Sequence, residues 1–325
     1  MSRTSSIPEP DVMQLVERVC AGDVRALARA ISLVENDSPL AAELLAACFP
    51  HSGRALRIGV TGSPGAGKST IVDKLARHYR ANDVSIGVIA VDPTSPFTGG
   101  AILGDRIRMH ENLNDPGFYV RSMATRGSLG GLARTTADAA SVIEASGKDV
   151  VLIETVGVGQ DEIDIVRLSD ITIVVLVPGM GDDVQSLKAG IMEIADLFVV
   201  NKADREGADR VEKEVRAMQS LASSHDSWVP PVVKTVASTG EGIDELTETI
   251  EQMKQWLYAD GRLEARRKVY WRERITEMMR HGLMRQVREH GLSDAELEKH
   301  AALVAGRQEN PYTLVPELVA RVFKS

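Results

Sequence analysis

The chain lacks the features that mark disulfide-stapled, membrane-spanning and nucleic-acid-binding proteins. It has two cysteines, Cys20 and Cys48, and neither belongs to a Cys-x-x-Cys pair, which disfavours a disulfide framework or a zinc site. The longest apolar run, Ile171 to Val177, has the length of a strand and is too short to cross a bilayer. The net charge of −8 disfavours a general nucleic-acid role, which would favour a basic face. The first residues hold no apolar signal core, so we expect a cytoplasmic protein. From the run lengths and the charge we expect no membrane and no nucleic-acid partner.

What the chain does contain is a glycine-rich loop between an apolar strand and a helical pattern. Residues Gly62 to Ser69 fit the spacing G-x-x-x-x-G-K-[ST], after Leu56–Val60 and before Ile71–Tyr79. Glycines let the backbone curl N–H groups around phosphate oxygens, and the next helix points its N-terminus at the same anion. Lys68 would place a charge at the outer phosphates, and Ser69 a hydroxyl at Mg²⁺. A chance glycine-rich turn is the alternative, but the flanking strand and helix favour a nucleoside triphosphate site. The predicted loop residues are Gly62, Ser63, Pro64, Gly65, Ala66, Gly67, Lys68, Ser69 and Thr70.

A second strand end predicts the base. The apolar run Leu197–Val200 leads into Asn201-Lys202-Ala203-Asp204. The Asp204 carboxylate can accept two hydrogen bonds from guanine, whereas adenine lacks that pair of donors and would leave the carboxylate unpaired. Lys202 can lay its aliphatic stem over the base, and Asn201 can tie this loop back to the glycine-rich loop. A polar turn is the alternative for the tetrapeptide alone, but downstream of a phosphate loop it favours GTP over ATP.

Three carboxylates fall where a metal ion needs ligands. The run Val150–Glu154 is a buried-type strand that ends in an acid, the place where such sites hold Mg²⁺ directly or through water. Asp92 ends the strand Ile86–Val91, and Asp105 lies in a glycine-rich segment, residues 93–108, that reads as a switch loop. Each acid alone would be interpreted as a surface or capping residue. The phosphate loop in the same chain favours a place for them in the nucleotide site. The predicted metal ligands are Ser69, Asp92, Asp105 and Glu154, and the predicted catalytic residues are Lys68, Asp92, Asp105 and Glu154.

The remaining loops supply contacts but no evident general base. Backbone N–H groups of Ala237, Ser238 and Thr239, which follow a strand, could touch the guanine oxygen. No Ser/His/Asp or Cys/His arrangement is apparent, and the seven histidines are scattered. Positioning and electrostatics would then carry most of the catalysis, so we expect slow intrinsic turnover unless a partner completes the site.

Apolar patterns predict the architecture. Helical spacing marks three helices in the first fifty residues, and from Leu56 to about Met253 strands alternate with helices. Several strands are apolar throughout, as expected for parallel strands covered on both faces. We predict an α/β fold of the P-loop NTPase class, with a doubly wound, mostly parallel sheet and helical extensions at both ends. The expected domains are 1–54 (N-terminal helical extension), 55–258 (GTPase domain) and 259–325 (C-terminal helical arm). The predicted strands are Ile58–Val60, Ile86–Val91, Phe118–Val120, Val150–Ile153, Ile171–Val177, Leu197–Val200 and Val232–Val236.

After Gly261 the pattern is helical only, with a short final helix from Pro311 to Phe323. The basic residues of the long helical stretch are intermixed with acids, which fits a solvated helix face better than a nucleic-acid patch. The bases are Arg266, Arg267, Lys268, Arg272 and Arg274, and the acids are Glu264, Glu273 and Glu277. Large apolar side chains at Trp271, Met278 and Met279 could pack on the sheet or against a second subunit. We favour a homodimer, because these groups lie far along the chain from the glycine-rich loop.

Long strings of residues resemble one family. Residues 91–100, 102–105, 127–131, 154–160 and 178–188 look like the MeaB/ArgK group of P-loop GTPases, which includes the methylmalonic aciduria type A protein. The resemblance implies a homodimeric, Mg²⁺-dependent enzyme with GTP as substrate and GDP as product. It implies a chaperone of an adenosylcobalamin-dependent acyl-CoA mutase, typically methylmalonyl-CoA mutase. GTP hydrolysis would gate cofactor loading and protect or reactivate that mutase, and the 178–188 loop would couple nucleotide state to it.

Three other functions compete with this interpretation. Some members of the family carry a label as kinases of amino-acid (lysine/arginine/ornithine) transport proteins, which would need a protein acceptor near the γ-phosphate. A metallochaperone GTPase of the nickel-insertion type would need Cys/His ligands, which Cys20 and Cys48 do not convincingly supply. A membrane-targeting GTPase would need a methionine-rich domain or a basic amphipathic segment, and Met278-Met279 is too little.

Overall fold

The structure is a computed structural model of the whole chain. It describes residues 11–92, 115–124, 131–155, 167–179, 195–221, 228–290 and 292–322. The chain divides into two compact units, residues 1–262 and 263–325. The boundaries predicted for three domains remain a prediction.

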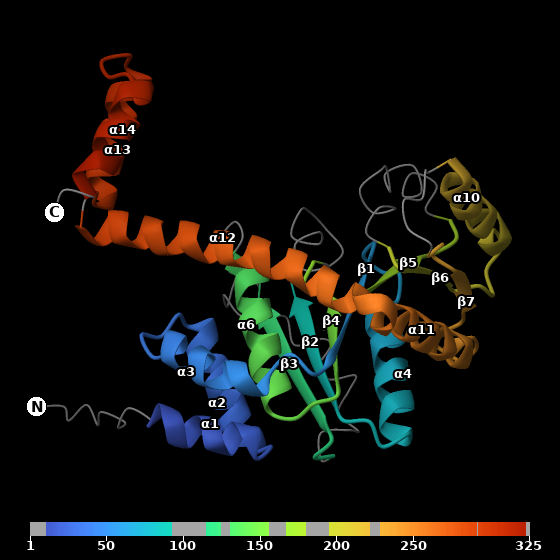
Figure 1. Ribbon diagram of the computed structural model, residues 1–325. Coiled ribbons are helices and arrows are strands. Elements are labelled where there is room, and N and C mark those ends of the chain that lie inside the picture. The colour runs from blue at the N-terminus through green and yellow to red at the C-terminus, as the bar shows by residue number, and fades with distance from the viewer. Residues whose placement is uncertain are drawn as a thin grey trace, which may run out of the picture. The chain divides into compact units, whose positions relative to one another are not determined.

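A parallel sheet forms the centre of the first unit (Figure 1). Its seven strands lie in the order β3-β2-β4-β1-β5-β6-β7, and every neighbouring pair is parallel. The chain steps from β1 to one side of the sheet and later returns to its other side through β5, so the strand order reverses at β1. Ligands of such sheets bind at the carboxyl ends of the strands beside this point. The predicted doubly wound α/β fold and all seven predicted strands are confirmed. The strands are β1 Leu56–Gly62, β2 Ile86–Asp92, β3 Phe118–Ala124, β4 Val150–Glu154, β5 Ile171–Leu176, β6 Leu197–Asn201 and β7 Val232–Thr235.

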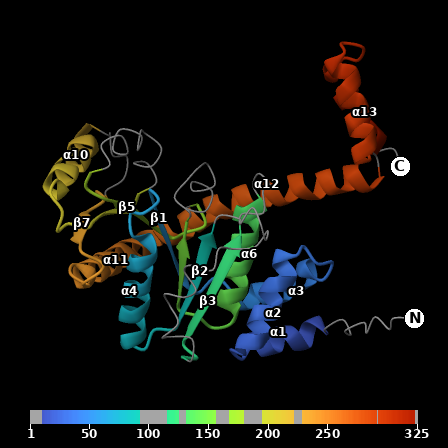
Figure 2. The ribbon, with the colours of Figure 1, turned by 180° about the vertical axis from the view of Figure 1, so that it is seen from behind.

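Helices cover both faces of the sheet. Helix α4 (Lys68–Ala81) joins β1 to β2, and α6 (Gly131–Ala145) joins β3 to β4 in the opposite direction along the sheet. Because parallel crossovers are right-handed, opposite directions place the two helices on opposite faces. Helix α11 (Ile243–Tyr258) packs beside α4, and α10 (Ala208–Leu221) packs on β6 and β7. Figure 2 shows the same layers from behind.

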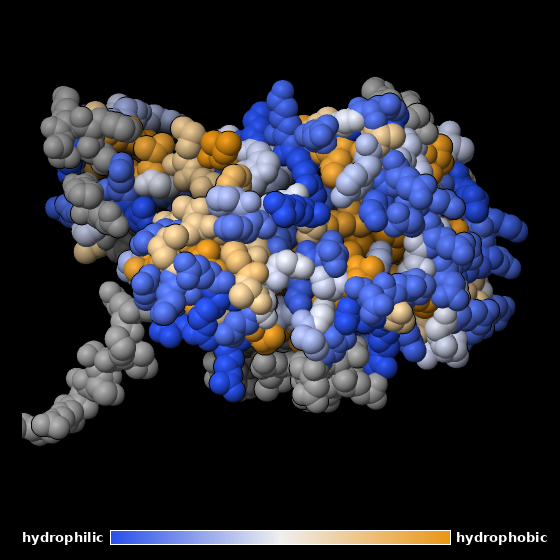
Figure 3. Space-filling model, turned by 60° about the horizontal axis from the view of Figure 1, so that its bottom comes forward, coloured by the Kyte–Doolittle hydropathy of each residue, from blue (hydrophilic) through white to orange (hydrophobic). Residues whose placement is uncertain are grey.

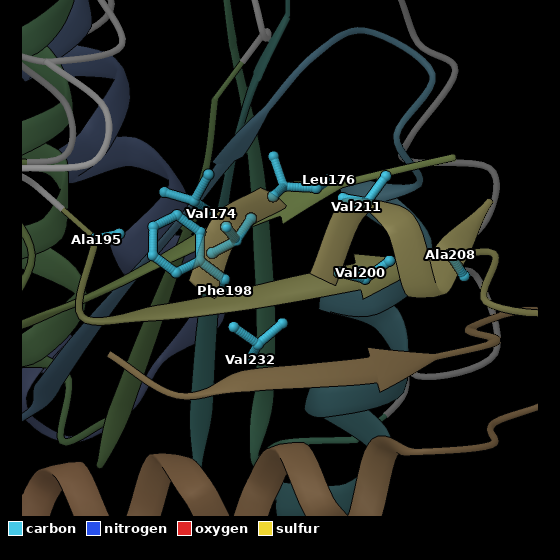
Figure 4. Packing of buried hydrophobic residues seen from close by; sticks show 9 residues of the cluster. Val174, Leu176, Ala195, Phe198, Val200, Ala208, Val211 and Val232 are labelled. Carbon is cyan, nitrogen blue, oxygen red and sulfur yellow. The ribbon is translucent and has the colours of Figure 1, made fainter. Parts of the chain in front are cut away.

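An apolar cluster fixes the half of the sheet that carries β6 (Figure 4). Phe198 of β6 is completely buried between side chains of β5, β7 and α10. Burial of a phenylalanine side chain stabilises the folded state by about 1.5–3 kcal/mol. Directly before the strand begins, the Asp196 carboxylate accepts the backbone N–H of Thr172 at 2.8 Å and so ties the start of β6 to β5. Strand β6 is therefore a rigid support for the residue at its carboxyl end, Asn201.

Three helices precede the sheet, as predicted: α1 (Val12–Cys20), α2 (Val24–Glu35) and α3 (Ala41–Cys48). The Asp23 carboxylate caps α2 by accepting the N–H groups of Arg25 and Ala26. The buried sides of α2 and α3 pack against α6, which fastens this N-terminal extension to the sheet (Figure 1).

The second unit is helical. Helix α12 (Arg262–His290) is followed by α13 (Asp294–Ala305) and α14 (Pro311–Val322). Ser293 and Glu296 form a capping box at the start of α13, a helix that the sequence patterns did not single out. Helix α14 confirms the predicted final helix, and residue 323 lies outside the described residues. Several large apolar side chains of α12 are exposed, namely Val269, Ile275, Met278, Met279, Leu283 and Met284.

The surface is mostly polar on the face that Figure 3 presents, with hydrophobic residues in patches between hydrophilic ones. Within the described ranges, no helix is both long enough and apolar enough to cross a bilayer.

Candidate functional site

The glycine-rich loop lies between the carboxyl end of β1 and the first residue of α4 (Figure 1). Two of its glycines cannot be replaced without a clash. A Cβ on Gly62 (φ +139°) would lie 2.2 Å from the carbonyl oxygen of Val175, and a Cβ on Gly67 (φ +93°) 2.3 Å from Nδ2 of Asn201. The loop therefore passes closely over β5 and β6, and its backbone N–H groups can turn toward one point, as an anion cradle requires.

Lys68 begins α4 and folds its side chain into this loop. Only 5% of the residue is exposed, and the ammonium donates to the carbonyl oxygens of Gly62 (2.6 Å) and Ser63 (3.1 Å). The positive charge thus sits beside the N-terminus of α4, where the helix dipole also favours an anion. Loop, helix and ammonium together suit the phosphates of a nucleotide.

Two oxygen ligands meet next to the loop. The Ser69 hydroxyl donates to Oε1 of Glu154 at 2.6 Å, and Glu154, 5% exposed, ends β4 directly beside β1. Mg²⁺ prefers such hard oxygens and takes few of them from the protein, since phosphates and water complete its octahedral shell. The pair therefore fits a magnesium ion. Within the described residues no cluster of three or more His, Cys, Asp or Glu side chains could hold a metal by itself.

Two further predicted metal ligands are described only in part or not at all. The backbone of Asp92 ends β2, and the register places Ala90 opposite Glu154, so Asp92 lies at the same edge of the sheet. Its side chain lies outside the described residues, as does Asp105. So do the predicted switch segment 93–108, residues 157–160, residues 127–130 and the part of the 178–188 loop after Gly179. Their roles stay predictions.

Asn201 joins three segments through one buried side chain, of which 3% is exposed. Its Nδ2 donates to the carbonyl oxygen of Ala66 at 2.8 Å, which is the predicted tie to the glycine-rich loop. Its Oδ1 accepts the Thr235 hydroxyl and the Ala237 backbone N–H, each at 3.1 Å. The loop predicted for the phosphates and the loop predicted for the base are thus held by the same amide group.

The next residues face outward from this junction. Lys202 adopts a left-handed conformation (φ 57°), and its ammonium donates to the carbonyl oxygen of Gly65 at 2.7 Å. Asp204, Ser238 and Thr239 are exposed, and Thr239 closes a turn through its N–H bond to the Val236 carbonyl oxygen. Exposed groups beside a buried junction can take up a base, and these contacts with guanine remain a prediction.

Three hydroxyl groups of this edge were not predicted from the sequence. Thr155, directly after Glu154, donates to the Thr61 hydroxyl of β1 at 3.0 Å, and both are buried. Thr235 of β7 holds Asn201, as described above. The available signal was a polar residue at the end of an otherwise apolar strand, which is costly to bury unless it is hydrogen-bonded.

Known proteins similar to this chain are GTPases. A protein-family model described as methylmalonyl-CoA mutase-associated GTPase MeaB matches residues 27–291. A candidate GTPase of Pyrococcus abyssi is 47% identical over 312 residues, which cover 95% of this chain and 96% of that protein. GTPase ArgK of Escherichia coli is 39% identical over 282 residues, 83% of this chain and 85% of ArgK.

A solved structure has the same fold over nearly the whole length. The crystal structure of a LAO/AO transport system kinase is 29% identical, with a TM-score of 0.71, and covers 99% of this chain and 100% of its own. The agreement extends over the helical extensions as well as the sheet.

Proposed function

The chain belongs to the MeaB family of methylmalonyl-CoA mutase-associated GTPases, and from this premise we propose that it serves such a mutase as a chaperone. It is a GTPase, as the family match and the relatives establish. The proposed client is an adenosylcobalamin-dependent acyl-CoA mutase of the methylmalonyl-CoA mutase type. GTP hydrolysis would gate loading of its cofactor and protect or reactivate it.

The Asn201 junction carries the proposal for the nucleotide. It holds Ala66 of the phosphate loop and Ala237 of the base loop at once, so phosphate and base contacts are set relative to each other. Lys68 would neutralise the outer phosphates, and Asp204 would accept the two guanine donors, with the Ala237–Thr239 N–H groups near the guanine oxygen. Nucleotide discrimination would then depend on Asp204, and nucleotide retention on the junction.

Mg²⁺ would be held by the hydroxyl of Ser69 and, directly or through water, by the carboxylates of Glu154, Asp92 and Asp105. The contact of Ser69 with Glu154 supports the first two. The ion would neutralise charge on the β- and γ-phosphates. The chain's own part is to fix the ligands and the phosphates; no side chain is assigned as general base. Positioning then carries the reaction, which fits a slow enzyme that a partner accelerates.

A homodimer is part of the proposal. Met278 and Met279 of α12 are 54% and 62% exposed, and neighbouring apolar side chains extend the same helix surface. Contiguous apolar surface of this kind marks association sites. Analytical ultracentrifugation of the purified chain checks it, and a monomer at micromolar concentration would contradict it.

The partner is tested by retrieval from the native cell extract, with the tagged chain loaded with GDP or with a non-hydrolysable GTP analogue. We expect mass spectrometry to identify an acyl-CoA mutase among the retained proteins, in an amount that depends on the nucleotide. The Lys68→Ala variant is the control, because it should retain the mutase independently of nucleotide or not at all. Absence of any acyl-CoA mutase under both conditions would contradict the proposal.

A second candidate is phosphoryl transfer to a protein, because the solved structure that matches the whole chain is named a transport system kinase. The two functions differ in their product. If inorganic phosphate accounts for all GTP consumed in the presence of cell extract, the kinase function is excluded.

A further inference from the structure

The end of helix α2 is fastened to the sheet by charged side chains. Arg121 of β3 donates through Nε to Oε1 of Glu35 at 3.0 Å, through Nη2 to Oε2 of Glu35, and through Nη2 to the Ser32 hydroxyl at 3.1 Å. Both members are largely buried, since 24% of the Arg121 side chain and 13% of the Glu35 side chain are exposed. Two residues beyond α2, Asp37 accepts from Arg134 at 3.3 Å.

Arg121 lies on the strand beside the one that ends at Asp92, and Arg134 lies on the helix that follows it in the chain. Strand β3 is at the edge of the sheet and pairs with β2, in a register that places Arg121 opposite Ile89 and Ala124 opposite Asp92. Arg121 is therefore three residues, or about 10 Å along the strand, from the neighbour of Asp92. Arg134 lies in the first turns of α6, which begins at Gly131.

An edge strand depends on such fastening. Among the strands that the structure describes, β3 has a hydrogen-bonded neighbour on one side only, so its end is held less firmly than the end of a central strand. Paired with Glu35, the guanidinium bonds in a two-pronged geometry that fixes direction as well as distance. The hydrogen bond that Arg121 donates to Glu35 also raises the pKa of Arg121, so the guanidinium stays charged.

We propose that the N-terminal helical extension is a positioning element of the nucleotide site: Glu35–Arg121, assisted by Asp37–Arg134, holds the end of β3 beside Asp92 and thereby tunes the affinity for Mg²⁺. The inference rests on the proposed role of Asp92 as a magnesium ligand. Glu35 and Arg121 are positioning residues, because they act through the strand and not on the nucleotide.

The test is the variant Glu35→Gln, which keeps the size of the side chain and removes its charge. Residues that hydrogen-bond a metal ligand directly change metal affinity by about 10- to 100-fold when removed, and Glu35 acts only through the strand. We therefore expect the Mg²⁺ concentration for half-maximal GTP hydrolysis to rise by up to about tenfold. GDP affinity without Mg²⁺ should stay unchanged, because the phosphate loop and Asn201 set it. Hydrogen exchange of the amides in residues 118–124, measured on the nucleotide-free protein, should become faster.

Arg18→Gln is the matched control. It breaks an ion pair of the same extension, Arg18–Asp23, which joins α1 to the start of α2 and whose side chains hydrogen-bond no described residue of β3 or α6. This variant should change neither the Mg²⁺ requirement nor exchange in β3. In the double variant Glu35→Gln/Arg121→Gln the Mg²⁺ requirement should be no higher than in the worse single variant, since the two residues act as one pair.

The variant Asp92→Asn distinguishes a failure of the proposed magnesium role of Asp92 from a failure of the positioning role of the extension. If Asp92→Asn leaves the Mg²⁺ requirement unchanged, the proposed role of Asp92 is wrong. If Asp92→Asn raises it while Glu35→Gln, with wild-type GDP affinity, changes neither the requirement nor exchange in β3, the positioning role of the extension is refuted. A Glu35→Gln protein that unfolds at a lower temperature but keeps the wild-type Mg²⁺ requirement would show a purely structural pair and equally refute it.

Discussion

The substitution Asn201→Asp tests the junction between the two nucleotide loops with almost no change in shape. The aspartate keeps an oxygen for the Thr235 hydroxyl and the Ala237 N–H, each of which bonds Asn201 at 3.1 Å. It loses the amide nitrogen, and an oxygen then faces the Ala66 carbonyl oxygen that now accepts from Nδ2 at 2.8 Å. One contact, the tie to the phosphate loop, is thereby turned from attraction into repulsion.

The size of the effect follows from burial. Asn201 is 3% exposed, so water cannot replace the lost donor. A buried acceptor left without its donor costs about 1–3 kcal/mol, and burying a carboxylate there adds to this cost. We expect a loss of about 3 kcal/mol in GDP binding, which corresponds to an affinity about a hundredfold lower. Protonation of the aspartate would restore a donor, so part of the affinity should return at low pH.

The assay is calorimetric titration of GDP into wild type, Asn201→Asp and Thr235→Val, with thermal unfolding recorded for each. Thr235→Val is the control, because it removes one donor to Oδ1 and leaves the tie to Ala66; we expect its affinity to fall by about tenfold at most. An Asn201→Asp protein that is folded and binds GDP within about twofold of wild type would refute the junction as the determinant of nucleotide retention.

Three further predictions concern single side chains. Lys68→Ala should abolish GTP binding or hydrolysis, and unaltered turnover would remove the phosphate-loop assignment. Asp204→Asn should weaken the preference for guanine and make xanthosine triphosphate the better ligand in a competition assay, whereas an unchanged preference would contradict the base-site assignment. The hydrogen bond from Arg80 lowers the pKa of Asp115 below its ordinary 3.8, so this pair stabilises the fold above that pH and is lost as the pH falls through the lowered pKa. Asp115→Asn should therefore lower the unfolding temperature at pH 7, and the decrease should shrink as the pH falls below 3.8; a decrease that stays the same as the pH is lowered would contradict a stabilising ion pair.

The fold could be predicted largely because its signals are local. Runs such as Ile171–Val177 are apolar throughout, and this is the pattern of a strand that helices cover on both faces. Asp23 is at the same time a capping residue and the start of a helical pattern, so α2 could be placed closely. Helix α13 was not predicted, because few apolar residues follow its capping box at regular helical spacing.

The hydrogen bonds among the residues of the candidate site could be predicted only in part. The tie from Asn201 to the phosphate loop could be expected, because both segments end strands that meet at one edge. The bond from Lys202 to Gly65 could not, since it depends on a left-handed backbone at Lys202 that no side-chain pattern announces. The pairing of Glu35 with Arg121 joins residues 86 positions apart, and only the packing of the extension brings them together.

Whether the chain serves a mutase is decided by single-turnover GTP hydrolysis, measured with and without a purified adenosylcobalamin-dependent methylmalonyl-CoA mutase. We predict slow release of inorganic phosphate by the chain alone, faster release with the mutase, and no such acceleration with ATP in place of GTP. A hydrolysis rate that the mutase leaves unchanged, by a protein that binds and turns over GTP, would contradict the proposed chaperone role.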